Sequence, residues 1–154
     1  MLKKLMHILG ICHSMGYPMI IIADNNPEDH PNLKALAMIE SGIDDTAKGH
    51  KGERSRYQIR QNVWEFYGET SFSVSNVENV DQATIVALKY IKNLVETFYQ
   101  YNKRVPTEME TYAMWRLGFQ GFLARDFDLL KCSPEIQDSC RRFANLVHLY
   151  SSQN

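Results

Sequence analysis

The sequence predicts a mainly helical fold of five or six helices with one small irregular lobe, arranged as a single domain. Between residues 32 and 150, apolar residues recur mostly at intervals of three and four, which is the period of one face of an α-helix. Residues 43–55 lack this period and contain two glycines and an Asp-Asp pair, residue types typical of turns. We therefore expect an irregular segment or a short β-hairpin there.

The length and charge of the chain narrow its class. A chain of 154 residues fits one domain with one sizeable core. The net charge is −1, so the composition does not favour a basic surface built for nucleic acid. Near-neutrality is compatible with a sugar polymer as ligand, because sugars are held by hydrogen bonds and stacking rather than by net charge.

The N-terminal 23 residues are typical of a secretory signal. Lys3 and Lys4 precede the uncharged, largely apolar segment 5–23, which ends in Ala23 before a polar stretch. The apolar run is too short and too interrupted for a stable membrane span. We expect residues 1–23 to be cleaved and residues 24–31 to be a linker, which predicts export to the periplasm, cell envelope or medium. A retained anchor and a buried N-terminal helix remain alternatives.

Two cysteines follow the predicted signal. Cys132 and Cys140 permit a disulfide in an exported chain, provided that a turn at Ser133-Pro134 brings them together. Two free, partly buried thiols are the alternative, and the sequence does not favour either.

The first predicted helix carries an unusual carboxylate. Leu33, Leu36, Ala37 and Glu40 fall on one face at i, i+3, i+4 and i+7, and Gly42 is a natural stop. Solvated glutamates normally occupy the opposite, polar face. Glu40 is therefore a candidate for a partly buried carboxyl group in the last turn of this helix.

The other helices follow from the same periodicity. Residues 69–79 are predicted as a loop, and residues 32–154 form the predicted domain. The remaining predicted helices span residues 61–68, 81–98, 106–118, 119–130 and 134–150.

A buried glutamate suits one kind of chemistry. Cleavage of a glycosidic bond needs a proton donor beside the leaving oxygen. Desolvation among apolar walls raises the pKa of a carboxyl toward neutrality, so that it still holds a proton. Glu40 is placed for that role.

Glu40 belongs to a series of short segments that occur in a set order along the chain. They are Glu40-Ser41-Gly42, then Arg56-Tyr57-Gln58-Ile59 after the lobe, the Ala-containing helix at 83–95, and Tyr112-Ala113-Met114-Trp115-Arg116-Leu117-Gly118. This order and spacing resembles the lytic transglycosylase branch of the lysozyme-like superfamily, over about residues 31–122.

The resemblance implies a mainly α, lysozyme-like α+β fold around a catalytic helix, with peptidoglycan glycan strands as substrate. It implies that Glu40 protonates the glycosidic oxygen and then acts as base, while the muramoyl C6 hydroxyl attacks and a 1,6-anhydro product forms. Neither a second carboxylate nor a cofactor is required. The sequence shows no recognisable metal site.

The resemblance also suggests substrate-binding residues, each with a structural alternative. Ser41 either hydrogen-bonds near the carboxylate or caps the helix. Gln58 either presents its amide to a sugar or to the catalytic carboxyl, or links loop backbone. Tyr57 and Trp115 either line the cleft or pack in the core. Tyr112, one turn before Trp115, could supply a hydroxyl that tryptophan lacks.

Two features leave open which activity the chain has. Arg116 stands where the family has asparagine, and a cation beside Glu40 would lower its pKa and weaken a general acid. A non-catalytic glycan-binding protein is therefore one alternative. Asp44 or Asp45 as a second carboxylate would instead make the chain a muramidase that uses water, although turn formation is the more ordinary role of such residues.

Overall fold

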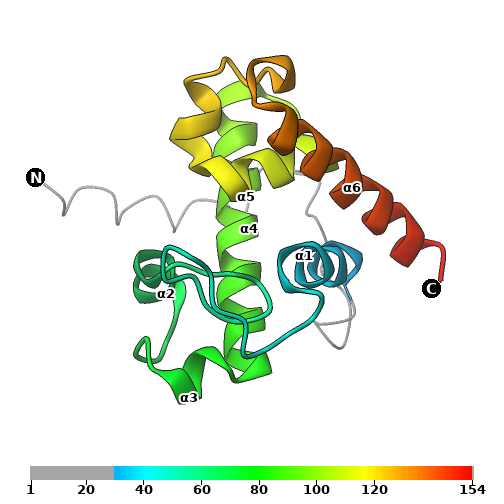
Figure 1. Cartoon of the computed structure of the whole chain (residues 1–154). Helices are drawn as coiled ribbons and strands as arrows, with labels where there is room; N and C mark the ends of the chain where they lie inside the picture. The colour runs from blue at the N-terminus through cyan, green and yellow to red at the C-terminus, as the bar shows by residue number, and fades with distance from the viewer. Residues whose placement is uncertain (1–29, 154) are drawn as a thin grey trace, which may run out of the picture.

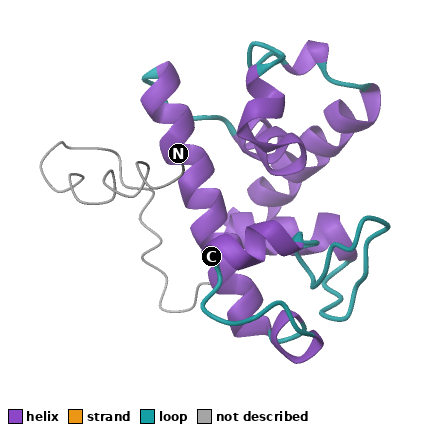
Figure 2. Cartoon of the chain, turned by 90° about the vertical axis from the view of Figure 1, so that its left-hand side faces the viewer, coloured by secondary structure: helices purple, strands orange, loops and turns teal. Residues whose placement is uncertain are grey.

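The computed structural model describes residues 30–153, and within this range it is mainly helical (Figure 2). The elements are α1 Pro31–Ser41, α2 Gln61–Tyr67, α3 Val74–Val77, α4 Val80–Asn102, α5 Glu108–Leu123, the 3₁₀ helix η2 Leu129–Lys131, and α6 Pro134–Ser151. The prediction of a mainly helical fold is confirmed. The predicted signal at 1–23 and nearly all of the linker at 24–31 lie outside the described residues.

The long helix α4 runs through the centre of the molecule (Figure 1). Helices α2 and α3 pack against one part of it, and α5 packs against another. Helix α6 packs against both α1 and α5, so the N-terminal and C-terminal helices of the described chain lie side by side. The lobe between α1 and α2 follows directly after α1, the helix that carries Glu40, and so begins next to the predicted site.

Local signals in the sequence explain most helix ends. Helix α1 ends at Gly42, which adopts a left-handed conformation with φ of 69° that glycine tolerates without a Cβ clash. Thr107 and Glu110 form a reciprocal capping box at the start of α5. Ser133 caps α6 with Pro134 in its first turn.

Two predicted boundaries differ from the structure. The helices predicted at 106–118 and 119–130 are joined in α5, which is broken at Gly118 (φ 71°, ψ 161°) and ends at Leu123, before turns and η2. The predicted loop at 69–79 contains the single-turn helix α3, which is too short to show an apolar period.

The lobe at residues 42–60 is irregular rather than a hairpin. Within the described residues it has only the isolated bridges Lys48–Arg54 and Arg54–Ile59. An ion pair between Asp45 and Arg56 and left-handed backbone at Ser55 and Gln58 give it a fixed shape.

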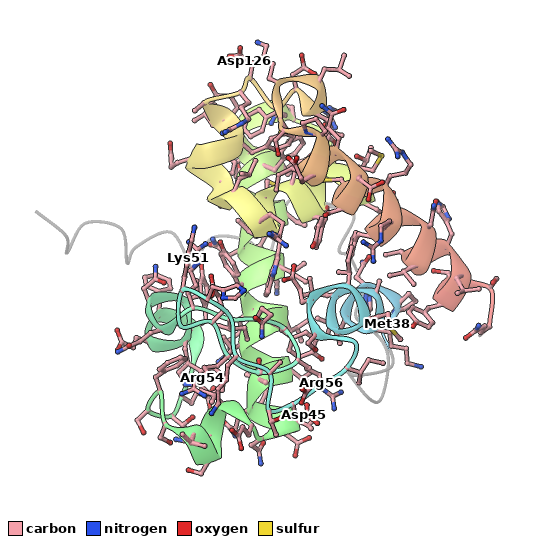
Figure 3. All side chains as sticks on the ribbon, in the orientation of Figure 1. Met38, Asp45, Lys51, Arg54, Arg56 and Asp126 are labelled. Carbon is pink, nitrogen blue, oxygen red and sulfur yellow. The ribbon has the colours of Figure 1, made fainter. Side chains whose placement is uncertain are left out.

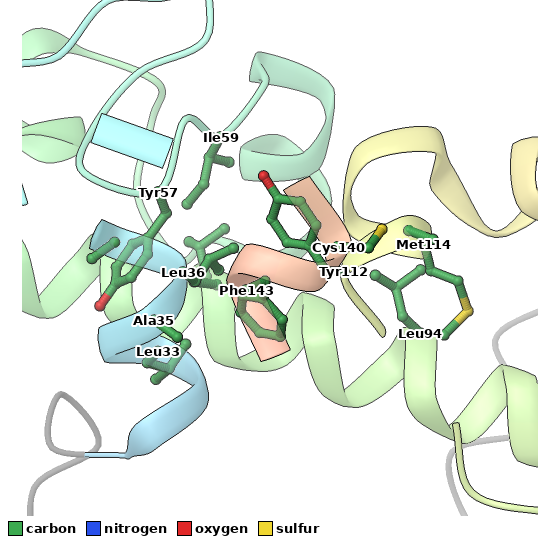
Figure 4. Packing of buried hydrophobic residues seen from close by; sticks show 14 of the residues in the cluster. Leu33, Ala35, Leu36, Tyr57, Ile59, Leu94, Tyr112, Met114, Cys140 and Phe143 are labelled. Atoms are coloured by element: carbon green, nitrogen blue, oxygen red, sulfur yellow. The ribbon is translucent and has the colours of Figure 1, made fainter. Parts of the chain in front are cut away.

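The core between the helices combines aliphatic and aromatic side chains, among them Tyr57, Tyr112 and Phe143 (Figure 4). The largest fully buried ones are Trp64, Tyr57, Tyr112, Phe98, Phe122 and Phe143. Cys132 and Cys140 are both buried and free, which agrees with the second of the two sequence alternatives. Burial raises the pKa of the Cys140 thiol to about 12, so the thiol stays protonated at neutral pH. Across residues 30–153, none of the helices has the length and apolar character that a membrane crossing requires.

Candidate active site

Glu40 occupies the last turn of α1, and its side chain is only 7% exposed. Burial raises the pKa of this carboxyl above its ordinary value of 4.5, while Arg116 and a hydrogen bond from Tyr112 act in the opposite direction. The carboxylate of Glu53 adds to the rise. Burial is the largest of these effects, so the carboxyl retains its proton to higher pH than a solvated glutamate.

Tyr112 holds the Glu40 carboxyl directly. Its hydroxyl donates to Oε1 of Glu40 at 2.8 Å, across 72 positions of sequence. The Tyr112 ring stacks on Phe143 of α6, with centroids 5.0 Å apart and planes 15° apart. Burial and the Glu40 charge raise the pKa of Tyr112 far above 10, so this hydroxyl remains a proton donor.

Arg116 lies one helical turn after Tyr112 and approaches the same oxygen. Its Nη1 is 3.8 Å from Oε1 of Glu40 and 3.5 Å from the Tyr112 hydroxyl. The Arg116 side chain is 43% exposed, so water weakens its attraction for the carboxylate. Arg116 therefore reduces the rise in the Glu40 pKa without cancelling it.

Glu53 is a residue that the sequence analysis did not single out. It lies in the lobe with its side chain 15% exposed, and its charge acts on both Glu40 and Arg116. Its carboxylate accepts a hydrogen bond from the Lys51 backbone N–H at 2.9 Å and faces Arg60 Nε at 3.4 Å. Although burial opposes them, these contacts help to lower the pKa of Glu53 below its ordinary value. The site therefore pairs one carboxyl of raised pKa with one of lowered pKa.

Two predicted site residues, Ser41 and Gln58, serve to fix the lobe. Ser41 Oγ donates to the carbonyl of Arg56 at 2.9 Å and accepts from the backbone N–H of Asp44 at 3.0 Å, which joins α1 to the lobe. Gln58 donates its amide to the carbonyl of Ser55 at 3.1 Å, the structural link that was its alternative role.

Tyr57 packs in the core, the second of its two alternatives, and does not line the cleft. Its side chain is 1% exposed, and its hydroxyl is 3.0 Å from Thr84 Oγ1 inside the core. The backbone turns at Gln58, which is left-handed, and Tyr57 and Ile59 on either side of it are both buried.

Neither aspartate of the lobe takes the place of a second catalytic carboxylate. Asp44 is fully exposed and accepts hydrogen bonds from the backbone and side chain of Thr46, which is a turn. Asp45 forms an ion pair with Arg56. No three His, Cys, Asp or Glu side chains within residues 30–153 converge as metal ligands do.

The side chain of Trp115 packs against other aromatic rings. Its ring lies 5.2 Å from that of Tyr90, which lies 5.3 Å from that of Tyr67. A shallow hollow of about 460 Å³ lies beside Glu53, and Glu40 is not part of its wall. The residues that line this hollow are Lys51, Arg60, Gln61, Asn62 and Glu65 (Figure 3 labels Lys51).

The comparisons with known proteins add no family. No family model, no curated protein and no solved structure matches the chain. The geometry around Glu40 is therefore the basis for a proposed function.

Proposed function

We propose that this chain has a lysozyme-like fold and is a peptidoglycan lytic transglycosylase, in which Glu40 is the catalytic acid and base. The observation that supports this most directly is the sheltered Glu40 carboxyl, which has a raised pKa and a tyrosine hydroxyl 2.8 Å away. A proton donor of this kind is what glycosidic cleavage requires.

The two contacts of Glu40 assign different tasks to its two oxygens. Tyr112 donates to Oε1, and Arg116 is also nearest Oε1. Because donors already surround Oε1, the proton is best carried on Oε2. The Oε2 proton passes to the glycosidic oxygen as the bond from the anomeric carbon to that oxygen breaks. The resulting carboxylate is then stabilised by Tyr112 and Arg116.

The second half of the reaction restores the acid. The muramoyl C6 hydroxyl attacks the anomeric carbon, and its proton returns to Glu40 as the new bond forms. The products are a 1,6-anhydro sugar and a free hydroxyl on the leaving strand, and no water is consumed. The carboxyl acts once as acid and once as base, so a single glutamate suffices.

A second candidate, a muramidase that uses water, is favoured by Glu53. Its charge acts on Glu40, and its pKa is lowered, so it is ionised where Glu40 is protonated. Glycoside hydrolases use such a pair, one carboxyl as acid and the other as base or nucleophile. The transglycosylase remains the first proposal because it accounts for the order of motifs around Glu40.

The test is digestion of purified sacculi with the full-length protein, followed by mass spectrometry of the released fragments. We expect anhydro-muropeptides from the native protein, none from Glu40→Gln, and native yield from Glu96→Gln, which changes an exposed glutamate on α4. Unchanged release by Glu40→Gln would exclude Glu40 from the mechanism.

Glu53→Gln separates the two candidates. Products heavier by one water, lost in Glu53→Gln, would establish the muramidase instead. Anhydro products that persist in Glu53→Gln support the single-carboxyl route. Binding of sacculi by the native protein without any product would contradict both and leave a glycan-binding protein.

A further inference from the structure

Three aromatic rings from three helices form a continuous row at the surface. Tyr67 of α2, Tyr90 of α4 and Trp115 of α5 follow one another with centroid distances of 5.3 and 5.2 Å. All three side chains are partly exposed, and Phe66, which is highly exposed, extends the row with its ring 4.7 Å from Tyr67.

The row begins beside the catalytic candidate. Trp115 directly precedes Arg116, which contacts Glu40. At the middle of the row, the charge of Arg60 acts on Tyr90, and Arg60 also faces Glu53 at 3.4 Å. The row therefore has Arg116 next to one end of it and, near its middle, Arg60, which helps to line the hollow of about 460 Å³.

The composition of this row differs from that of the chain's other aromatic cluster. Around Phe127, the rings of Phe98, Phe119 and Phe122 pack with centroids 5.0 to 5.4 Å apart and carry no polar atom, while the exposed Tyr101 joins them at 5.5 Å. Tyrosine and tryptophan combine a flat apolar face with a polar edge, which suits a surface wetted on one side. A row made only to fill the core would not need a polar edge on Tyr67, Tyr90 and Trp115 alike.

Pyranose sugars match such a surface. The C–H groups on one face of the ring stack on aromatic faces, while hydroxyl and N-acetyl groups take hydrogen bonds from a polar rim. The hollow supplies that rim through the amides of Gln61 and Asn62 and the cations of Lys51 and Arg60. Its volume falls within the range of small-molecule sites.

We propose that Tyr67, Tyr90 and Trp115 are a stacking platform for N-acetylhexosamine units of a β-1,4-linked glycan, on one side of the bond that Glu40 cleaves. The identity of the sugar rests on the proposed function. The platform holds the strand in register so that one glycosidic oxygen meets the Glu40 carboxyl, and it makes affinity depend on strand length.

The test measures binding in the Glu40→Gln variant, which removes cleavage, with chitooligosaccharides of two to six units as probes. Trp64 is fully buried and Trp115 is partly exposed, so ligand on the platform is expected to alter the Trp115 emission alone. Trp115→Phe should abolish the fluorescence change. Binding to that variant is therefore measured by calorimetry. Longer probes should bind more tightly than the disaccharide.

Paired substitutions at Tyr90 separate stacking from packing. Tyr90→Phe keeps the flat ring and should bind the hexasaccharide as before, whereas Tyr90→Leu keeps apolar bulk and should bind it roughly tenfold more weakly. Tyr101→Leu, an exposed tyrosine near the end of the same helix, is the control and should bind normally. Thermal unfolding checks that each variant is folded.

The outcomes distinguish this inference from the proposed function. Equal affinity of folded Tyr90→Leu and Tyr90→Phe, or no binding of any probe, would overturn the platform, even if the native protein cleaves sacculi. Ring-dependent binding by a protein that never cleaves sacculi would support the platform and refute the enzyme.

Discussion

Replacing Arg116 by asparagine should move the alkaline limb of the activity profile upward by about one pH unit. The Nη1 atom lies 3.8 Å from Oε1 of Glu40. At that distance, Coulomb's law gives roughly 1–2 kcal/mol for an effective dielectric constant of about 40–80, the range suited to a side chain in partial contact with water. Since about 1.4 kcal/mol corresponds to one pKa unit, loss of the cation raises the Glu40 pKa by about one unit.

The sign follows from the proposed role of Glu40 as an acid. Activity requires its proton and falls as the pH rises through its pKa, so a higher pKa extends activity to higher pH. The assay is kcat/KM for release of anhydro-muropeptides, measured from pH 4 to 9 for the native protein and for Arg116→Asn. The difference should shrink as salt is added, because the guanidinium is 43% exposed.

Arg141→Asn provides the matched control. Arg141 is an exposed arginine on α6 that pairs with Asp138, and its loss should leave the limb in place. A limb that stays fixed or moves to lower pH in Arg116→Asn would refute the electrostatic reasoning. It would mean that Arg116 acts on the sugar and not on the acid.

Three other changes test the same site. Glu40→Gln should raise the unfolding temperature above about pH 4 and leave it unchanged below that pH. The reason is that a buried carboxyl with a raised pKa destabilises the folded protein once the same carboxyl ionises in the unfolded chain. A gain in unfolding temperature that does not depend on pH would contradict this. Tyr112→Phe should lower kcat at least tenfold and lower the unfolding free energy in urea titrations by roughly 1–2 kcal/mol, because Glu40 loses its hydrogen-bond donor. A folded variant with native kcat would exclude Tyr112 from orienting the acid. Gly49→Ala should reduce both stability and activity, because a Cβ there would lie 2.7 Å from Gln58 Oε1 and overlap Glu53; an unperturbed variant would show that the lobe yields easily.

The sequence predicted the helices well because their cause is local. Apolar spacing, the stop at Gly42 and the Thr107 cap act within a few residues, and each lies at or near an observed boundary. Helix α3 was missed because one turn cannot display a period. Gly118 predicts the end of a helix, whereas in the structure α5 continues beyond the break at this glycine to Leu123.

The site was predictable only where a motif or a helical face marked it. Glu40 stood out as a carboxylate on an apolar face, and Tyr112 and Arg116 lie on successive turns of one predicted helix. Glu53 carried no such signal, because its nearness to Glu40 depends on how the irregular lobe folds back. The inward turn of Tyr57 likewise depends on the backbone at Gln58.

Helix α6 contributes no group to the proposed chemistry, yet it supports both halves of the site. It packs against α1, which carries Glu40, and against α5, and its Phe143 lies under the Tyr112 ring. During synthesis, the ribosome must therefore release residues 134–151 before the acid and its hydroxyl partner can be locked together. A nascent chain that already exposes Glu40 still lacks the support of α6 for Tyr112, so the proposed cell-wall-cutting activity requires the last helix to be made and packed.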